Sequence, residues 1–206
     1  MKFFSKTYLN IFHDSAKRCF NQLPDNTYAQ VRLAFLQIQI GNFPEAEKLL
    51  LAVDEKSENS ALVKFTLAEC YLLLAREART QSLSDRLRNC INNGLKVLSE
   101  LENCKIENHR DGSSNIALSK KLKADLLYES SFLKESDVKK LSISSLELFN
   151  DLEPDTQANY FNQAICYLRS GDVSLAIQLL LKSAGEGYSQ KFSTGVWNAL
   201  GVAYRK

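Results

Sequence analysis

A dipeptide that returns at a fixed interval constrains the fold of this chain more than any other feature of its sequence. Leu33-Ala34 is followed 34 residues later by Leu67-Ala68, and a similar pair, Leu200-Gly201, stands near the C-terminus. Each pair lies in a run whose apolar residues recur every three or four positions, which is typical of an amphipathic helix. A period of this length indicates stacked helical units, because one such unit is too small to bury its apolar face alone.

Glycine divides two of these units into two helices each. Gly41 separates a helix expected over 27–39 from a second helix, in which Ala46 lies on the apolar face. Gly171 and Ala176 repeat the arrangement later in the chain. Glycine is a common residue at the end of a helix. We therefore expect two antiparallel helices in each unit.

The last unit carries the most specific motif. Residues 197–204 read WNALGVAY, and this W-x2-L-G-x2-Y pattern resembles the opening of a tetratricopeptide repeat. The resemblance implies an all-α fold, a right-handed tetratricopeptide-repeat α-solenoid of antiparallel helix pairs. A small residue at the repeat position of Ala34 and Gly201 would let the two helices of a unit approach closely. We expect both residues to lie where those helices cross.

The repeat also predicts how the chain is organised. The expected segments are the second helix of a truncated repeat at 1–26, a repeat at 27–60, a repeat with a long first helix and an insertion at 61–102, a polar loop at 103–114, a degenerate repeat at 115–156, a repeat at 157–193, and the first helix of a truncated repeat at 194–206. Interior repeats need neighbours on both sides, so we expect an interior slice of a longer solenoid.

Several stretches also resemble one particular scaffold family. Residues 28–47, 61–77, 88–98 and 197–202 are similar to the large tetratricopeptide scaffold subunit of the superkiller complex. The long first helix at 61–77, followed by an insertion, is the most specific part of this resemblance. The segment 130–155 matches the family only weakly.

The superkiller resemblance implies a non-catalytic protein–protein interaction scaffold. Members of that family hold a DExH-box RNA helicase and WD-repeat subunits in a complex that feeds messenger RNA to the exosome for 3′-to-5′ decay. The exosome is then an indirect partner, and the expected location is the cytoplasm, with a nuclear pool. An alternative is an adaptor of another assembly, ciliary, chaperone or cell-cycle, because the same repeat serves many functions.

Composition excludes several function classes but selects no partner. The chain has 206 residues, and its 26 Lys and Arg against 24 Asp and Glu leave a net charge of +2, too small to indicate nucleic acid or an anionic membrane. The most apolar stretch, 62–75, contains Lys64 and Glu69 and is too short to span a bilayer. We therefore expect no membrane partner.

The catalytic and metal-binding candidates are weak. His109-Arg110-Asp111 imitates a kinase triplet, but Ile116 stands where that motif needs its metal-binding Asn. Cys104 and His109 are the only neighbouring Cys and His residues, whereas a zinc site needs three or four ligands. We expect no enzyme activity, no metal and no cofactor.

The cysteines are better explained as buried core residues than as nucleophiles, and the lysines as solvated surface residues than as RNA ligands. Four cysteines lie in helical patterns beside apolar residues, as expected of buried thiols in a reducing compartment: Cys19, Cys70, Cys90 and Cys166. Five lysines could contact RNA phosphates, but they lack interleaved aromatic or Arg residues and suit a solvated helix face: Lys120, Lys121, Lys123, Lys139 and Lys140. We expect no direct contact with RNA.

The inner face of the solenoid is the candidate site for a partner. The repeat positions that face this groove are largely apolar: Arg32, Phe35, Ile38, Phe65, Leu72, Phe161 and Ile165, with Val31, Leu62, Leu73 and Leu168 beside them. A groove that clamps a peptide carboxylate would instead present Lys, Arg and Asn. Either tight winding buries the apolar face, or a partner's apolar segment fills it. We favour tight winding, because long helices leave a narrow groove.

Overall fold

The computed structural model describes residues 14, 15, 17–20, 22, 23, 25–55, 60–103, 112–133, 137–152, 157–185 and 190–206. In these residues the helices are α2 Thr27–Gln39, α3 Phe43–Asp54, α4 Ala61–Thr80, α5 Ser84–Asn103, α6 Gly112–Ser130, α7 Val138–Asn150, α8 Gln157–Ser170, α9 Val173–Ala184 and α10 Gln190–Ala203. No strand occurs in the described ranges. The prediction of an all-α solenoid of antiparallel helix pairs is confirmed.

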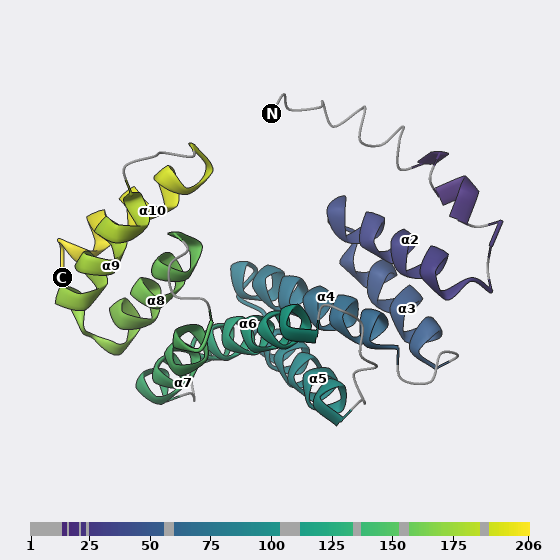
Figure 1. The fold of residues 1–206 in the computed structure, drawn as a ribbon, viewed down its shortest axis with the longest axis horizontal. Helices are drawn as coiled ribbons and strands as arrows, with labels where there is room; N and C mark the ends of the chain where they lie inside the picture. Colours follow the sequence, from purple (N-terminus) through teal and green to yellow (C-terminus); the bar gives the residue numbers. More distant parts are fainter. Residues whose placement is uncertain are drawn as a thin grey trace.

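The helices pair in chain order and the pairs stack side by side (Figure 1). The pairs are α2–α3, α4–α5, α6–α7 and α8–α9, and α10 packs on α9 and α8. Helices α2 and α3 lie at one end of the solenoid, α8 to α10 lie at the other, and α4 to α7 lie between them. No helix in the described part of the chain has the length and apolarity needed to cross a bilayer.

Glycine ends the first helix of two repeats in the same way. Gly41 has φ +82° and Gly171 has φ +99°, a left-handed conformation that glycine adopts without a steric penalty. The next residue in each case donates its N–H back to the helix, Asn42 to the Gln37 carbonyl at 2.9 Å and Asp172 to the Tyr167 carbonyl at 3.0 Å. This arrangement satisfies carbonyls that the helix end would otherwise leave without a donor. It turns the chain directly into the second helix.

The repeat between residues 61 and 103 is longer than its neighbours, but not through a separate insertion. Helices α4 and α5 have 20 residues each, and only residues 81–83 join them. Ser82 takes the left-handed conformation with φ +58°, and Leu83 donates its N–H to the Ala78 carbonyl at 2.9 Å. The expected insertion is therefore wrong: the extra residues extend both helices. Buried apolar side chains continue along both helices as far as Ala78 and Leu101, and these contacts stabilise the extra turns.

Other segment boundaries also differ from the expectation. Helix α6 begins at Gly112 and α5 ends at Asn103, so both ends of the predicted loop 103–114 are helical. Residues 104–111 lie outside the described residues, as do 1–13. Helix α10 begins at Gln190, four residues before the predicted segment 194–206.

The small repeat residues behave in two ways. Ala34, Ala68 and Ala164 are fully buried, as expected where paired helices cross. Gly201 is exposed, and a Cβ built on it would meet nothing within 4 Å. Helix α10 turns a different face, with Val196 and Leu200, toward its neighbours. The close crossing expected at Gly201 stays a prediction, because no second helix pairs with α10 among the described residues.

The hydrophobic core is divided into three clusters. The first and largest joins α2 to α6, and the third cluster joins α8 to α10. Between them lies a small cluster from α6, α7 and α8, whose buried members are Ala124, Leu146, Phe149 and Cys166. The middle of the solenoid thus buries fewer apolar side chains than either end, and it also buries polar ones such as Glu129, Ser142 and Ser145.

Candidate partner-binding groove

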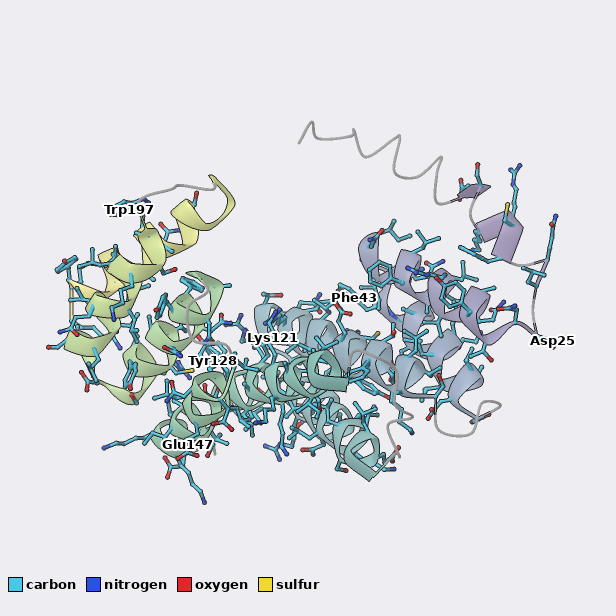
Figure 2. All side chains as sticks on the ribbon, in the orientation of Figure 1. Asp25, Phe43, Lys121, Tyr128, Glu147 and Trp197 are labelled. Carbon is cyan, nitrogen blue, oxygen red and sulfur yellow. The ribbon has the colours of Figure 1, made fainter. Side chains whose placement is uncertain are left out.

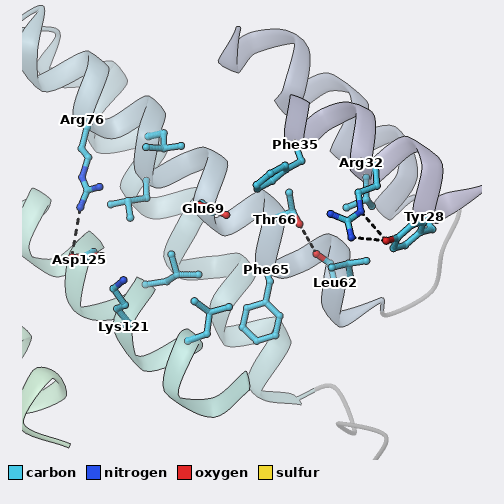
Figure 3. Close-up of a pocket in the computed structure, with 15 residues that line it drawn as sticks. Tyr28, Arg32, Phe35, Leu62, Phe65, Thr66, Glu69, Arg76, Lys121 and Asp125 are labelled. Carbon is cyan, nitrogen blue, oxygen red and sulfur yellow. Dashed lines mark hydrogen bonds and ion pairs between the residues drawn. The ribbon is translucent and has the colours of Figure 1, made fainter. Parts of the chain in front are cut away.

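A cavity of about 430 Å³ opens on the inner face of the solenoid between α2, α4 and α6 (Figure 3). Its walls come from these three helices: Tyr28, Val31, Arg32, Phe35, Leu62, Phe65, Thr66, Glu69, Leu72, Leu73, Arg76, Leu118, Lys121, Leu122 and Asp125. We call this cavity the groove. It contains four of the predicted site residues, Arg32, Phe35, Phe65 and Leu72, together with Val31, Leu62 and Leu73.

Helical periodicity brings these side chains to one face. Tyr28, Val31, Arg32 and Phe35 follow the spacing i, i+3, i+4, i+7, which places them along one stripe of α2. On α6 the groove residues at 118, 121, 122 and 125 have the same spacing. The sequence analysis missed the α6 wall, although this shared spacing could have identified it.

The remaining predicted residues lie elsewhere. Ile38 is buried in the first core cluster and does not line the groove, because its position on α2 faces the neighbouring helices. Phe161 and Ile165 line a second cavity of about 250 Å³, which we call the cleft. Leu168 is buried in the cluster of α8 to α10. The predicted set is thus divided between two cavities and the core.

Winding of the solenoid does not close the groove. Several of its apolar side chains remain accessible, with Tyr28 54 %, Leu62 47 % and Leu118 43 % exposed. A cavity of about 430 Å³ remains between α2, α4 and α6. The interpretation favoured from the sequence, that tight winding buries this face, agrees with Val31 and Leu72, which are each 3 % exposed, but not with Leu62.

Two polar contacts fix charged side chains on the groove wall. The Arg32 guanidinium donates to the Tyr28 hydroxyl oxygen at 2.8 Å from Nε and lies 4.9 Å from the centre of the Tyr28 ring. Arg76 forms an ion pair with Asp125 at 3.6 Å. Burial raises the pKa of Asp125 above its ordinary value, although the nearby Arg76 and Lys121 cations lower it. The groove is thus mainly apolar, with five charged side chains among its lining residues, namely Arg32, Glu69, Arg76, Lys121 and Asp125.

The basic helix α6 contributes to the groove in part. Lys121 lies on its wall, in the middle of the solenoid (Figure 2), whereas Lys120 forms an ion pair with Asp151 at 3.0 Å. Lys121 is exposed, as expected of a solvated lysine, although it also lines the open groove. Lys139 and Lys140 are exposed on α7.

The three buried cysteines of the described ranges do not form a reactive site. Cys70, Cys90 and Cys166 are buried free thiols, and burial raises the pKa of Cys70 to about 12 and that of Cys166 to about 11. These thiols are protonated at neutral pH, and a thiol is a weak nucleophile in that form. Cys19 is exposed, so its predicted burial is wrong. Cys104 and His109-Arg110-Asp111 lie outside the described residues, and no group of three metal-ligating side chains occurs within those described.

Comparison with known proteins supports the repeat. The sequence profile of the family described as tetratricopeptide repeat matches residues 14–65, which contain α2, α3 and the start of α4. No curated protein matches the chain. The chain therefore contains tetratricopeptide repeat sequence, and repeats of this type stack into solenoids whose concave surfaces bind other proteins.

Proposed function

We propose that this chain is a non-catalytic scaffold that binds an apolar segment of a partner protein in the groove. The observation that carries the proposal is the open apolar cavity between α2, α4 and α6, with Leu62 and Leu118 each more than two-fifths exposed. Contiguous exposed apolar surface on a folded chain is costly unless a partner covers it. Short apolar segments of partner proteins commonly dock in such grooves.

The finer proposal is that the assembly is the superkiller complex. The support for it is the sequence resemblance over 28–47, 61–77, 88–98 and 197–202, together with the unusually long α4–α5 pair. On this proposal the partners are a DExH-box RNA helicase and WD-repeat subunits, with the exosome as an indirect partner. The chain then supports 3′-to-5′ messenger RNA decay in the cytoplasm, with a nuclear pool. The alternative remains an adaptor of a ciliary, chaperone or cell-cycle assembly.

A matched pair of leucines tests the groove. Leu62 lies in the groove and is 47 % exposed, whereas Leu181 lies on α9 and is 51 % exposed. Leu62→Asp should weaken co-precipitation of partners at least about tenfold, because it places a charge in the apolar contact. Leu181→Asp, which makes the same change outside the groove, should leave co-precipitation unchanged. Circular dichroism of both variants checks that the helices are intact.

The identity of the co-precipitated proteins separates the assemblies. Recovery of the helicase and WD-repeat subunits with the unsubstituted chain, and their loss with Leu62→Asp, would support the superkiller proposal. Loss of different partners with the same variant would favour the adaptor alternative. Equal binding by both variants would show that the groove is not the contact surface.

A further inference from the structure

The stacking of first helices changes between α6 and α8. Helix α2 packs on α4, α4 packs on α6, and α8 packs on α10. No comparable backbone packing joins α6 to α8 among the residues that the structure describes. The cleft of about 250 Å³ lies at this point, lined from both sides: Arg76, Arg79, Asp125, Tyr128, Glu129, Phe149, Phe161, Asn162 and Ile165. The first helices therefore lose direct contact along the inner layer here, and α7 joins the two parts by packing on both α6 and α8.

One aromatic ring also connects the two parts. Phe132 lies in the turn directly after α6 and packs at the edge of the first core cluster. The Arg79 guanidinium, from the last turns of α4, lies 4.3 Å from the centre of the Phe132 ring. The Arg169 guanidinium, from the last turn of α8, lies 4.0 Å from the same centre. We call this arrangement the arginine clasp.

Hydrogen bonds hold the α8 side of the clasp. Arg169 donates from one terminal nitrogen to the Ser131 carbonyl at 2.6 Å and to the Ser131 hydroxyl oxygen at 3.2 Å. Ser131 is buried, at 1 % exposure. A guanidinium that donates to the backbone and stacks on a ring is fixed in both direction and plane. Arg169 therefore ties the end of α8 to the turn that follows α6.

Ion pairs hold the α4 side. The Glu129 carboxylate, whose side chain is 2 % exposed, lies 2.9 Å from Nε of Arg79 and 3.3 Å from Nε of Arg76. The Tyr128 ring meets Phe132 edge-on, with ring centres 5.3 Å apart. Because Glu129 and Phe132 lie one helical turn apart in sequence, the carboxylate holds Arg79 over the ring.

We infer that the junction between α6 and α8 is a hinge of the solenoid and that the arginine clasp sets its angle. The small middle core, with Ala124, Phe149 and Cys166 from three different helices, lies at the hinge. The Arg79 and Arg76 side chains are 36 % and 43 % exposed, so their guanidinium groups can return to water when the clasp opens. Packed interfaces of this kind hold a small number of discrete arrangements and do not deform continuously.

The hinge also connects the two cavities. Arg76 and Asp125 line both the groove and the cleft. Rotation of α8 to α10 about the middle core would change the width of the cleft, while Arg76 and Asp125, on α4 and α6, stay with the groove. The clasp therefore fixes the spacing between the groove and the C-terminal repeats, a spacing that a scaffold must hold to place two partners.

Distance measurements on the full chain test the hinge. One pair of spin labels would be placed through Lys48→Cys on α3 and Gln178→Cys on α9, and a control pair through Lys48→Cys and Lys96→Cys. All three positions are exposed. Cys19→Ser and Cys104→Ser would remove the other cysteines that are not described as buried. Double electron–electron resonance then reports the distance distribution of each pair.

Three variants distinguish an effect of the arginine clasp on the hinge from an effect on packing in general. Phe132→Leu keeps an apolar side chain but removes the ring, Phe132→Tyr keeps the ring, and Arg169→Lys keeps the charge but removes the planar group. Phe132→Leu and Arg169→Lys should broaden the Lys48–Gln178 distribution roughly twofold, as expected when a hinge is released. Phe132→Tyr should leave the distribution narrow, and the control pair should not change in any variant.

Three results would overturn the inference. The first is an unchanged distribution in both Phe132→Leu and Arg169→Lys. The second is an unsubstituted chain whose distribution is already as broad as that of the variants. The third is equal broadening of the control pair, which would assign Phe132 a general role in packing. If Phe132→Leu does not fold, Arg169→Lys alone decides, because Arg169 lies at the partly exposed end of α8.

Discussion

The region α2 to α6 and the region α8 to α10 use the same repeat but differ in how much they bury. Among the described residues, 23 buried side chains form one cluster in the first region, whereas 8 form the cluster of the second. The first region also contains the 20-residue helices α4 and α5, while α8 and α9 have 14 and 12 residues. Repeat identity is therefore a poor guide to local stability, which depends on what each helix covers.

This difference predicts unequal protection along the chain. In a solenoid, stability is approximately a sum over units and their nearest-neighbour interfaces, so a weakly buried end can open alone. We expect hydrogen exchange to be faster in 157–203 than in 61–103. The hinge between α6 and α8 would then separate two units that unfold independently.

The largest expected effect comes from one fully buried leucine in each region. Leu67→Ala and Leu180→Ala each remove a fully buried side chain, and such changes cost about 2–5 kcal/mol. Leu67→Ala should lower the free energy of unfolding of the main transition. Leu180→Ala should instead accelerate hydrogen exchange within α8 to α10 and leave α4 and α5 protected. Equal acceleration in both regions after Leu180→Ala would contradict the comparison.

Two helical glycines, Gly94 on α5 and Gly201 on α10, extend the comparison. A Cβ at Gly94 would lie 2.8 Å from Cδ1 of the fully buried Leu126 and 3.3 Å from Cβ of Tyr71, whereas a Cβ at Gly201 meets nothing. Gly201→Ala should stabilise its helix by up to about 1 kcal/mol, the difference in helix propensity. Gly94→Ala should destabilise the fold by about 1 kcal/mol, because overpacking exceeds that gain.

Thermal unfolding of the two glycine variants measures this contrast. Stabilisation by Gly94→Ala would mean that Leu126 can move aside and that the α4 to α6 core is looser than its burial indicates.

A smaller expected effect is a pH dependence of the free energy of unfolding, which arises from buried carboxyl groups between α4 and α6. Burial raises the pKa of Glu129, although Arg79 and Arg76 lower it, and burial likewise raises the pKa of Asp125. Between the ordinary and the raised pKa, the folded state holds more protons than the unfolded state. The contribution of these carboxyls to the free energy of unfolding should therefore fall as pH rises through that window.

Substitution by the neutral amide tests the pH effect. Urea unfolding of Glu129→Gln between about pH 4 and pH 7 should show a smaller loss of stability with rising pH than the unsubstituted chain does. An identical pH dependence in both proteins would show that Glu129 titrates normally.

The smallest effect is expected at the exposed ion pair between Lys120 and Asp151. Their side chains are 38 % and 60 % exposed, and exposed pairs contribute at most about 1 kcal/mol. Lys120→Ala should change the thermal midpoint little and should leave partner co-precipitation intact. Lys121 is not an equivalent control, since it lines the groove. A large loss of binding in Lys120→Ala would indicate that the partner contacts the outer side of α6.

The sequence predicted those parts of the fold that depend on neighbouring residues. The Leu-Ala pairs and the glycine turns place α2, α3, α8 and α9 because caps and periodicity are local signals. The start of α6 at Gly112 was not predicted, since no apolar period begins there. Half of the groove was predicted from α2 and α4, and the α6 wall was missed.

The charged contacts could not be predicted in this way. Glu129 is buried only because Arg76, 53 residues earlier, and Arg79 lie against it in the folded chain. A pattern that repeats every 34 residues carries no information about such a pair. The same holds for the clasp, whose three members come from different helices and a turn.

The length of the α4–α5 pair has a consequence for how a partner can sit. At a rise of 1.5 Å per residue, a 20-residue helix is about 10 Å longer than the 13-residue α2. A solenoid of identical units has translational symmetry, so a bound chain could slip by one unit and find the same contacts. The long α4–α5 pair breaks that symmetry at one position. A partner chain bound along the surface can therefore match the units in only one register.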